Sequence, residues 1–333
     1  MLLLLIAGLG KGLSVVSIPL FALVLSSAEM GEATVFISAM LVIAGSIGFG
    51  ANTLVMRERA HLGAQEYARF LVHVVSFVVM VWLVIGSTLQ LLLPRFLSQF
   101  GFSSSASALV LVGALFAAIV ELSQKVALAR EDIRAYGVVE VVRSVLLLAV
   151  AFALIGLGLE PIDGRTVGYV MALAITLGVA LRCFGSSLHG RLQWKAATFH
   201  RIVSFSLRSS PQVVAQWIRL GLDRILLAYV IGVAELGVYM VAFALSSAML
   251  VVTTAMNNLF TPKSLVLYKS GECVEVSRLR LRLLGGALGA AAAGRPATLS
   301  RRGSVAERGD QLALFHGLTF FDMDLFDGSI VIR

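Results

Sequence analysis

Charged residues are scarce in this chain. Only 14% of its 333 residues are charged and 58% are hydrophobic, and the mean hydropathy is +0.92. A soluble domain carries about 25% charged residues, so the composition excludes an ordinary soluble protein. The apolar runs are continuous and do not alternate at every second residue, which favours helices over a membrane β-barrel. The sequence therefore predicts an all-α membrane protein, a polytopic bundle of about eight transmembrane helices.

Cysteines and enzyme motifs are also few. The two cysteines, Cys183 and Cys273, are expected to be free thiols near helix ends, without a disulfide framework. The sequence contains no GxxxxGK[ST], HExxH, GxSxG or paired-cysteine metal motif, so we expect neither an enzyme nor a protein that needs a cofactor or a metal. The net charge of +8 does not indicate nucleic acid, because basic residues of membrane proteins gather in cytoplasmic loops.

Eight apolar runs are long enough to cross a bilayer, which takes about 20 residues. They cover residues 2–25, 33–56, 70–93, 105–124, 136–159 and 167–188, and two runs within 210–263. Basic residues crowd the loops on one side of these spans, whereas the other side holds only Arg95 and Arg165. By the positive-inside rule the crowded side is cytoplasmic. We therefore expect a multi-pass protein of the cell inner membrane with a cytoplasmic N-terminus.

An internal repeat appears when the chain is shifted by 206 positions. Residues 28–31, with the sequence AEMG, then align with residues 234–237, with the sequence AELG. Both copies start on the cytoplasmic side, so the repeat is parallel, as in transporters that bind substrate between two halves. The expected domains are a six-helix lobe at 1–188, a cytoplasmic loop at 189–209, the first two helices of a second lobe at 210–282, and a tail at 283–333. The spans stop near residue 283, which predicts a truncated second lobe followed by an aberrant tail. A disordered cytoplasmic tail is the alternative.

Among the charged residues inside the apolar spans, where charge is costly and usually functional, five are candidates for function. They are Lys11, Arg143, Arg219, Asp223 and Arg224. The four cations predict a cavity for an anionic substrate, and Asp223 is the candidate for ion coupling. Structural alternatives stay open: Arg219 and Asp223 are four apart and can pair on one helix face, Arg143 can pair with Glu140, and Lys11 can extend to the membrane surface.

The seventh and eighth spans carry a family resemblance. The segments LDRILL at 222–227 and GVAELGVY at 232–239, together with the opening hairpin at 19–31, resemble the polysaccharide-biosynthesis flippases. These are the O-antigen and exopolysaccharide transporters of the multidrug/oligosaccharidyl-lipid/polysaccharide exporter superfamily. The resemblance covers roughly residues 2–269. It implies two lobes, alternating access, and an undecaprenyl-diphosphate-linked oligosaccharide as substrate. By position it places Arg219, Arg224, Lys11 and Arg143 against the diphosphate and the sugar acids.

This resemblance also sets the expected partners. They are the lipid bilayer, the anionic lipid-linked oligosaccharide, a polysaccharide polymerase and a chain-length regulator, with no nucleic acid. Three other functions stay open: a cation-coupled multidrug exporter of the same superfamily, a membrane glycosyltransferase, and an inactive truncated fragment. The exporter would favour an acidic cavity, and the glycosyltransferase would need an acidic site on a sizeable external loop.

Overall fold

The computed structural model describes residues 12, 13, 16–48, 50–184, 196–209, 211, 215 and 221–246. The chain forms two compact units, Phe21–Met240 and the combination of Met1–Leu20 with Val241–Arg333. Within the second unit, the described residues 16–20 and 241–246 are helical. The account below concerns the first unit.

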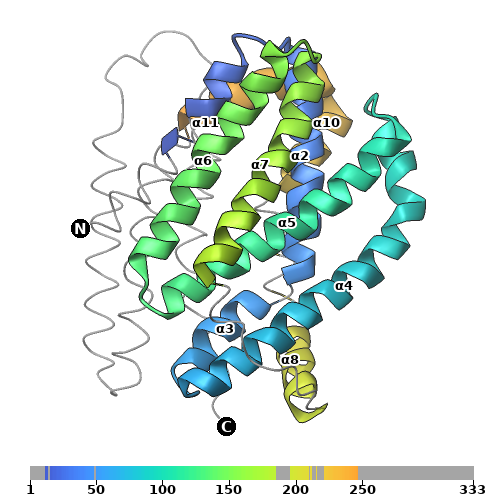
Figure 1. Cartoon of the computed structure of the whole chain (residues 1–333). Helices are drawn as coiled ribbons and strands as arrows, with labels where there is room; N and C mark the ends of the chain where they lie inside the picture. Colours follow the sequence, from blue (N-terminus) through green and yellow to red (C-terminus); the bar gives the residue numbers. More distant parts are fainter. Residues whose placement is uncertain are drawn as a thin grey trace, which may run out of the picture. The chain divides into compact units, whose positions relative to one another are not determined.

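All regular elements in the described residues are helices (Figure 1). Five are long and apolar enough to cross a membrane: α2 (Ser27–Gly48), α4 (Ala64–Ser98), α5 (Ser104–Ala129), α6 (Ile133–Gly156) and α7 (Pro161–Phe184). Four are shorter: α3 (Ala51–Arg59), α8 (Ala196–Arg208), α10 (Asp223–Ile231) and α11 (Val233–Ser246). The predicted all-α membrane bundle is confirmed. The first, seventh and eighth expected spans lie partly outside the described residues, so the count of eight stays a prediction.

Helix α2 is the internal helix of the bundle. In its most apolar stretch 78% of the residues are buried by protein, compared with 22% in α6. It packs on α4, α5, α7 and α10. Helix α6 instead exposes Val138, Val141 and Val145, which are spaced three and four apart and therefore form one apolar stripe. Such a stripe on the outside of a bundle is suited to contact lipid chains.

The second expected span, 33–56, is broken in the structure. Helix α2 ends at Gly48, and Gly50, with φ of 77°, caps the start of α3. Glycine adopts this left-handed backbone conformation without the steric penalty that a Cβ brings. The apolar run therefore continues across the break while the helix does not. Helix α2 also begins at Ser27, six residues before the expected start of this span at residue 33.

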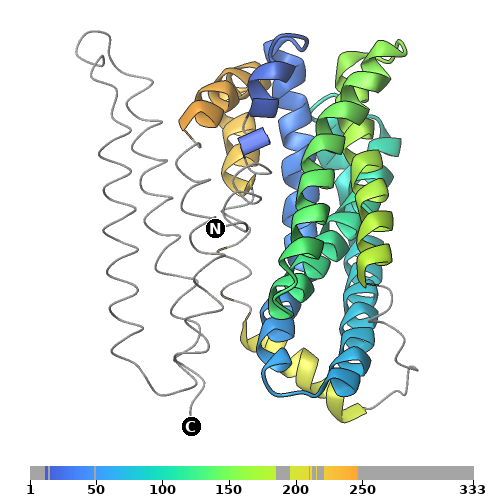
Figure 2. The ribbon, with the colours of Figure 1, turned by 60° about the vertical axis from the view of Figure 1, so that its left-hand side comes forward.

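Helices α6 and α7 form a tight antiparallel hairpin, visible in Figures 1 and 2. Two glycines of α7, four residues apart, make the close approach. A Cβ on Gly168 would lie 2.7 Å from the Cα of Ala151, and a Cβ on Gly164 would lie 2.5 Å from the side chain of Ile155. Small residues at this spacing let helix backbones approach closely in membranes.

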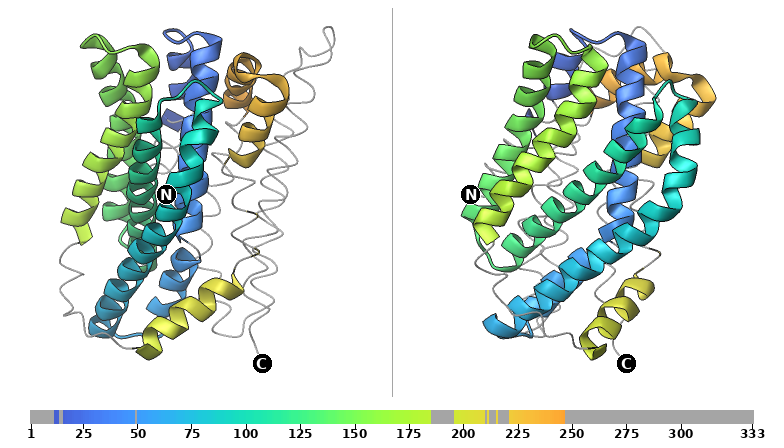
Figure 3. Two further views of the ribbon diagram at one scale, coloured as in Figure 1. Left: turned by 90° about the vertical axis from the view of Figure 1, so that its right-hand side faces the viewer. Right: turned by 45° about the vertical axis from the view of Figure 1, so that its right-hand side comes forward.

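The expected loop at 189–209 contains a helix. Helix α8 lies at the end of the bundle where α3 and the start of α4 lie, and it packs on both (Figure 3). Its buried side includes Ile202 and Ser206, while Arg201 faces out and donates from Nη2 to Oε1 of the buried Glu58 of α3, at 2.8 Å. The segment was expected as a loop because its average hydropathy is low, but one apolar face is enough to form a docked helix.

Candidate functional site

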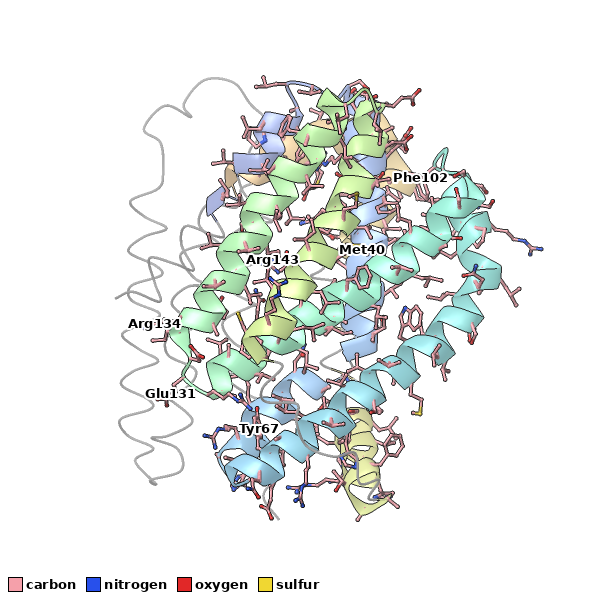
Figure 4. The ribbon with its side chains drawn as sticks, viewed as in Figure 1. Met40, Tyr67, Phe102, Glu131, Arg134 and Arg143 are labelled. Atoms are coloured by element: carbon pink, nitrogen blue, oxygen red, sulfur yellow. The ribbon has the colours of Figure 1, made fainter. Side chains whose placement is uncertain are left out.

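The Arg143 side chain lies between α6 and α7 (Figure 4) and is held by Glu140. Its Nη2 donates to Oε2 of Glu140 at 2.7 Å, and the same oxygen accepts from Nε2 of Gln124 of α5, also at 2.7 Å. The Glu140 side chain is 1% exposed and that of Arg143 is 22% exposed. The predicted local pair is therefore confirmed. The Nε of Arg143 is buried and has no hydrogen-bond partner among the described residues.

Three arginines gather around one tyrosine of α7. Tyr169 lies within electrostatic range of Arg143 on α6, Arg165 on α7 and Arg224 on α10. Glu140 also acts on this tyrosine. We call these four positions, Arg143, Arg165, Tyr169 and Arg224, the arginine cluster. Charges that come together from three helices inside an apolar bundle are costly unless they pair or receive a ligand.

Arg165 was not expected here. The sequence placed it in an outer loop at 160–166, whereas the structure places it in the first two turns of α7, where it is 7% exposed. Its guanidinium lies 4.6 Å from the centre of the Phe21 ring and contacts the sulfur of Met30. These neighbours are neutral, and Arg165 forms no ion pair with any described residue. Pro161 could have signalled the helix, since proline is favoured at the first helical position.

Asp223 and Arg224 begin helix α10. The carboxylate of Asp223 is in the first turn, where the positive end of the helix dipole favours it. Its Oδ1 is buried and accepts no hydrogen bond from any residue that the structure describes. Both residues act electrostatically on Tyr239 of α11. Asp223 is thus a partly buried acid next to the cluster, as an ion-coupling group would need to be.

Two of the predicted cations cannot be placed. Lys11 and Arg219 lie outside the described residues, as do Cys273 and the tail at 283–333. Arg143, Arg165 and Arg224 act electrostatically on the same tyrosine. The substrate-binding roles of Arg143, Arg224, Lys11 and Arg219 stay predictions. Among the described residues, no group of three or more His, Cys, Asp or Glu side chains could hold a metal ion.

Fold and site together define an all-α membrane bundle with an arginine cluster in its interior. No protein-family model matches the sequence, and no curated protein matches it. A solved structure described as "protein A" is similar, with a TM-score of 0.64 and 18% identity, and the match covers 99% of this chain and 74% of that one. At this identity the likeness shows the fold alone.

Proposed function

We propose that this protein is an inner-membrane flippase that moves an undecaprenyl-diphosphate-linked oligosaccharide across the bilayer for O-antigen or exopolysaccharide synthesis. The observation that carries the proposal is Arg165, a buried cation without an acidic partner among the described residues, beside two further arginines. A diphosphate supplies the charge that such a group lacks, and planar guanidinium groups bind phosphate oxygens in pairs.

The mechanism is alternating access. The arginine cluster receives the diphosphate from one side, the helices rearrange around it, and the substrate leaves on the other side. The isoprenoid chain stays in the bilayer, next to apolar stripes such as the one on α6. Asp223 is the proposed group that binds a proton or a cation and so couples movement to an ion gradient. No cofactor and no chemical step by this chain are part of the proposal. A polysaccharide polymerase and a chain-length regulator are the protein partners that this function implies.

The test is surface polysaccharide in cells whose own flippase gene is replaced by this one. Arg165→Ala, Arg219→Ala and Arg224→Ala should each lower the yield at least about tenfold, because a charged hydrogen bond contributes about 1.5–3 kcal/mol. Arg95→Ala is the matched control, since Arg95 is exposed at the end of α4, and it should leave the yield unchanged. Membrane abundance of each variant is measured in parallel. Normal polysaccharide from abundant Arg165→Ala and Arg224→Ala protein would contradict the proposal.

A cation-coupled drug exporter of the same superfamily is the second candidate. The buried Oδ1 of Asp223, which has no hydrogen-bond partner within the described part of the chain, is the observation that favours it, because an acid in such a position can exchange a proton for a cationic drug. Susceptibility to cationic dyes and drugs separates the two functions. An exporter would protect cells in a way that Asp223→Asn abolishes, whereas a flippase would leave susceptibility unchanged.

A further inference from the structure

The two copies of the sequence repeat adopt the same local structure. In the first copy, Glu29 reaches back to Ser26, whose backbone N and Oγ both donate to its Oε2 at 2.7 Å. In the second copy, Glu235 reaches back to Gly232, with Oε2 only 2.6 Å from where a Cβ on Gly232 would stand. Position 232 follows position 26 by the repeat offset, and 235 follows 29. Each copy is thus a helix start with a glutamate folded over its first residue.

The first helical hydrogen bond is repeated as well. Met30 N donates to the Ser26 carbonyl at 2.9 Å, and Leu236 N donates to the Gly232 carbonyl at 3.2 Å. Both donors are buried, at 2% exposure for Met30 and 0% for Leu236. The match found in the sequence is therefore a match in backbone geometry and burial.

The two copies also contact each other reciprocally. A Cβ on Gly31 would overlap the carbonyl oxygen of Val233, and a Cβ on Gly237 would overlap the carbonyl oxygen of Ser27. Gly31 and Gly237 are repeat equivalents, and so are Ser27 and Val233. The glycine of each repeat copy therefore contacts the same repeat position of the other copy, which is the pattern of a two-fold symmetric interface. We call these four residues the glycine seam.

The two repeat copies approach each other closely at the glycine seam, but the interactions that hold them together are weak. Within residues 26–31 and 232–237, no hydrogen bond or ion pair connects one copy to the other. The contact that the structure shows is close packing of backbone against backbone. An interface of this kind closes tightly because nothing projects between the backbones, and it opens without breaking strong bonds.

Its position is next to the arginine cluster. Met30 adjoins Gly31 in the sequence, and its sulfur contacts the Arg165 guanidinium. The starts of α2 and α11 lie side by side at one end of the bundle (Figures 2 and 3). This is the end opposite α3 and α8. The seam thus lies beside Arg165 of the cluster, at the end of the bundle that the basic loops predict to face outward.

We propose that the glycine seam is the outer gate of the transport path. It closes when the two repeat copies meet at Gly31 and Gly237, and it separates when substrate leaves the arginine cluster outward. This inference rests on the proposed function for the identity of what passes. The gate itself is defined by the reciprocal contact, so the two can be tested separately.

The test uses a buried cysteine as a reporter. In a chain with Cys183 and Cys273 changed to serine, Leu236→Cys is treated in intact cells with a membrane-impermeant maleimide. Gly31→Leu and Gly237→Leu should each raise labelling about tenfold, because overpacking against a backbone shifts the equilibrium toward the separated state. The two variants should act alike, since each occupies one half of the same contact. Their polysaccharide yield should fall.

Two controls separate opening from unfolding. Gly86→Leu adds the same side chain to α4, where a Cβ would meet nothing within 4 Å, and should leave labelling low. The reporter Leu97→Cys, at a fully buried position in the last turn of α4, should stay protected from the maleimide in all variants. If the leucine variants do not accumulate, Gly31→Ala and Gly237→Ala are used, because the overlap already occurs at Cβ.

The outcomes are distinct. Unchanged labelling at position 236 in abundant glycine variants would overturn the gate, as would a rise with only one of the two glycines. Increased labelling at position 236 in both glycine variants, together with a normal polysaccharide yield, would support the opening at the seam and contradict the proposed flippase function. A rise with a lower yield supports both.

Discussion

The sharpest single perturbation is Glu140→Gln, which removes one buried charge and keeps the shape of the side chain. Oε2 of Glu140 accepts hydrogen bonds from Arg143 and Gln124, both at 2.7 Å, and joins α5 to α6. Breaking a buried ion pair from one side typically costs 3–5 kcal/mol. Because the Arg143 side chain is 22% exposed, we expect the low end, about 3 kcal/mol.

A loss of this size is measurable as thermal stability in detergent. For a chain of 333 residues, with an unfolding entropy of about 2.1 cal/mol/K per residue, it lowers the Tm by roughly 4 °C, followed by circular dichroism at 222 nm. The control Glu160→Gln changes an exposed acid just before α7 and should alter stability by no more than about 0.5 kcal/mol.

The double variant Glu140→Gln/Arg143→Gln completes the cycle. It leaves no charge unpaired, so it should be more stable than the sum of the single losses predicts, by about 1–3 kcal/mol. A Tm for Glu140→Gln within 1 °C of the parent, or strictly additive losses, would refute the reasoning. The same double variant separates two roles of Arg143. If Arg143 binds the diphosphate, the stabilised protein still fails to export polysaccharide, whereas export returns if the arginine only joins helices.

Two further predictions concern packing. Arg201→Ala leaves the buried carboxylate of Glu58 without its partner and should lower the free energy of unfolding by about 1–3 kcal/mol, measured by the same melts, whereas Arg208→Ala, exposed on the same helix, should change it by less than about 0.5 kcal/mol. Gly168→Val forces α6 and α7 apart and should cost about 1–3 kcal/mol or more, whereas Gly178→Val, with open space around it in the same helix, should have a much smaller effect. Equal melts within either pair would contradict the packing described here.

Hydropathy predicted which segments are membrane helices but not where they end. The fourth span was expected at 105–124, and helix α5 runs on to Ala129. Hydropathy reports the apolar thickness of the bilayer, whereas a helix continues as long as its backbone bonds are satisfied, through the polar boundary region. The break at Gly50 was missed for the opposite reason, since side chains stay apolar while one left-handed residue interrupts the backbone.

The candidate site was only partly predictable. Arg143 and Arg224 could be identified because a charge within an apolar run is visible in the sequence. Arg165 could not be found this way, because it follows Pro161 and precedes the apolar part of its helix, so it resembled a loop residue. Its burial depends on Phe21 and Met30, which are distant in the sequence. Only the folded chain brings them together.

The reciprocal contact between the repeat copies has a consequence for how such a chain could arise. Because the contact is reciprocal, a single repeat copy carries both surfaces that the contact needs. An ancestral protein of half the length could therefore have assembled as a homodimer through the same glycines, before gene fusion joined the two subunits. After such a fusion, the two copies would be free to diverge everywhere except where they contact each other.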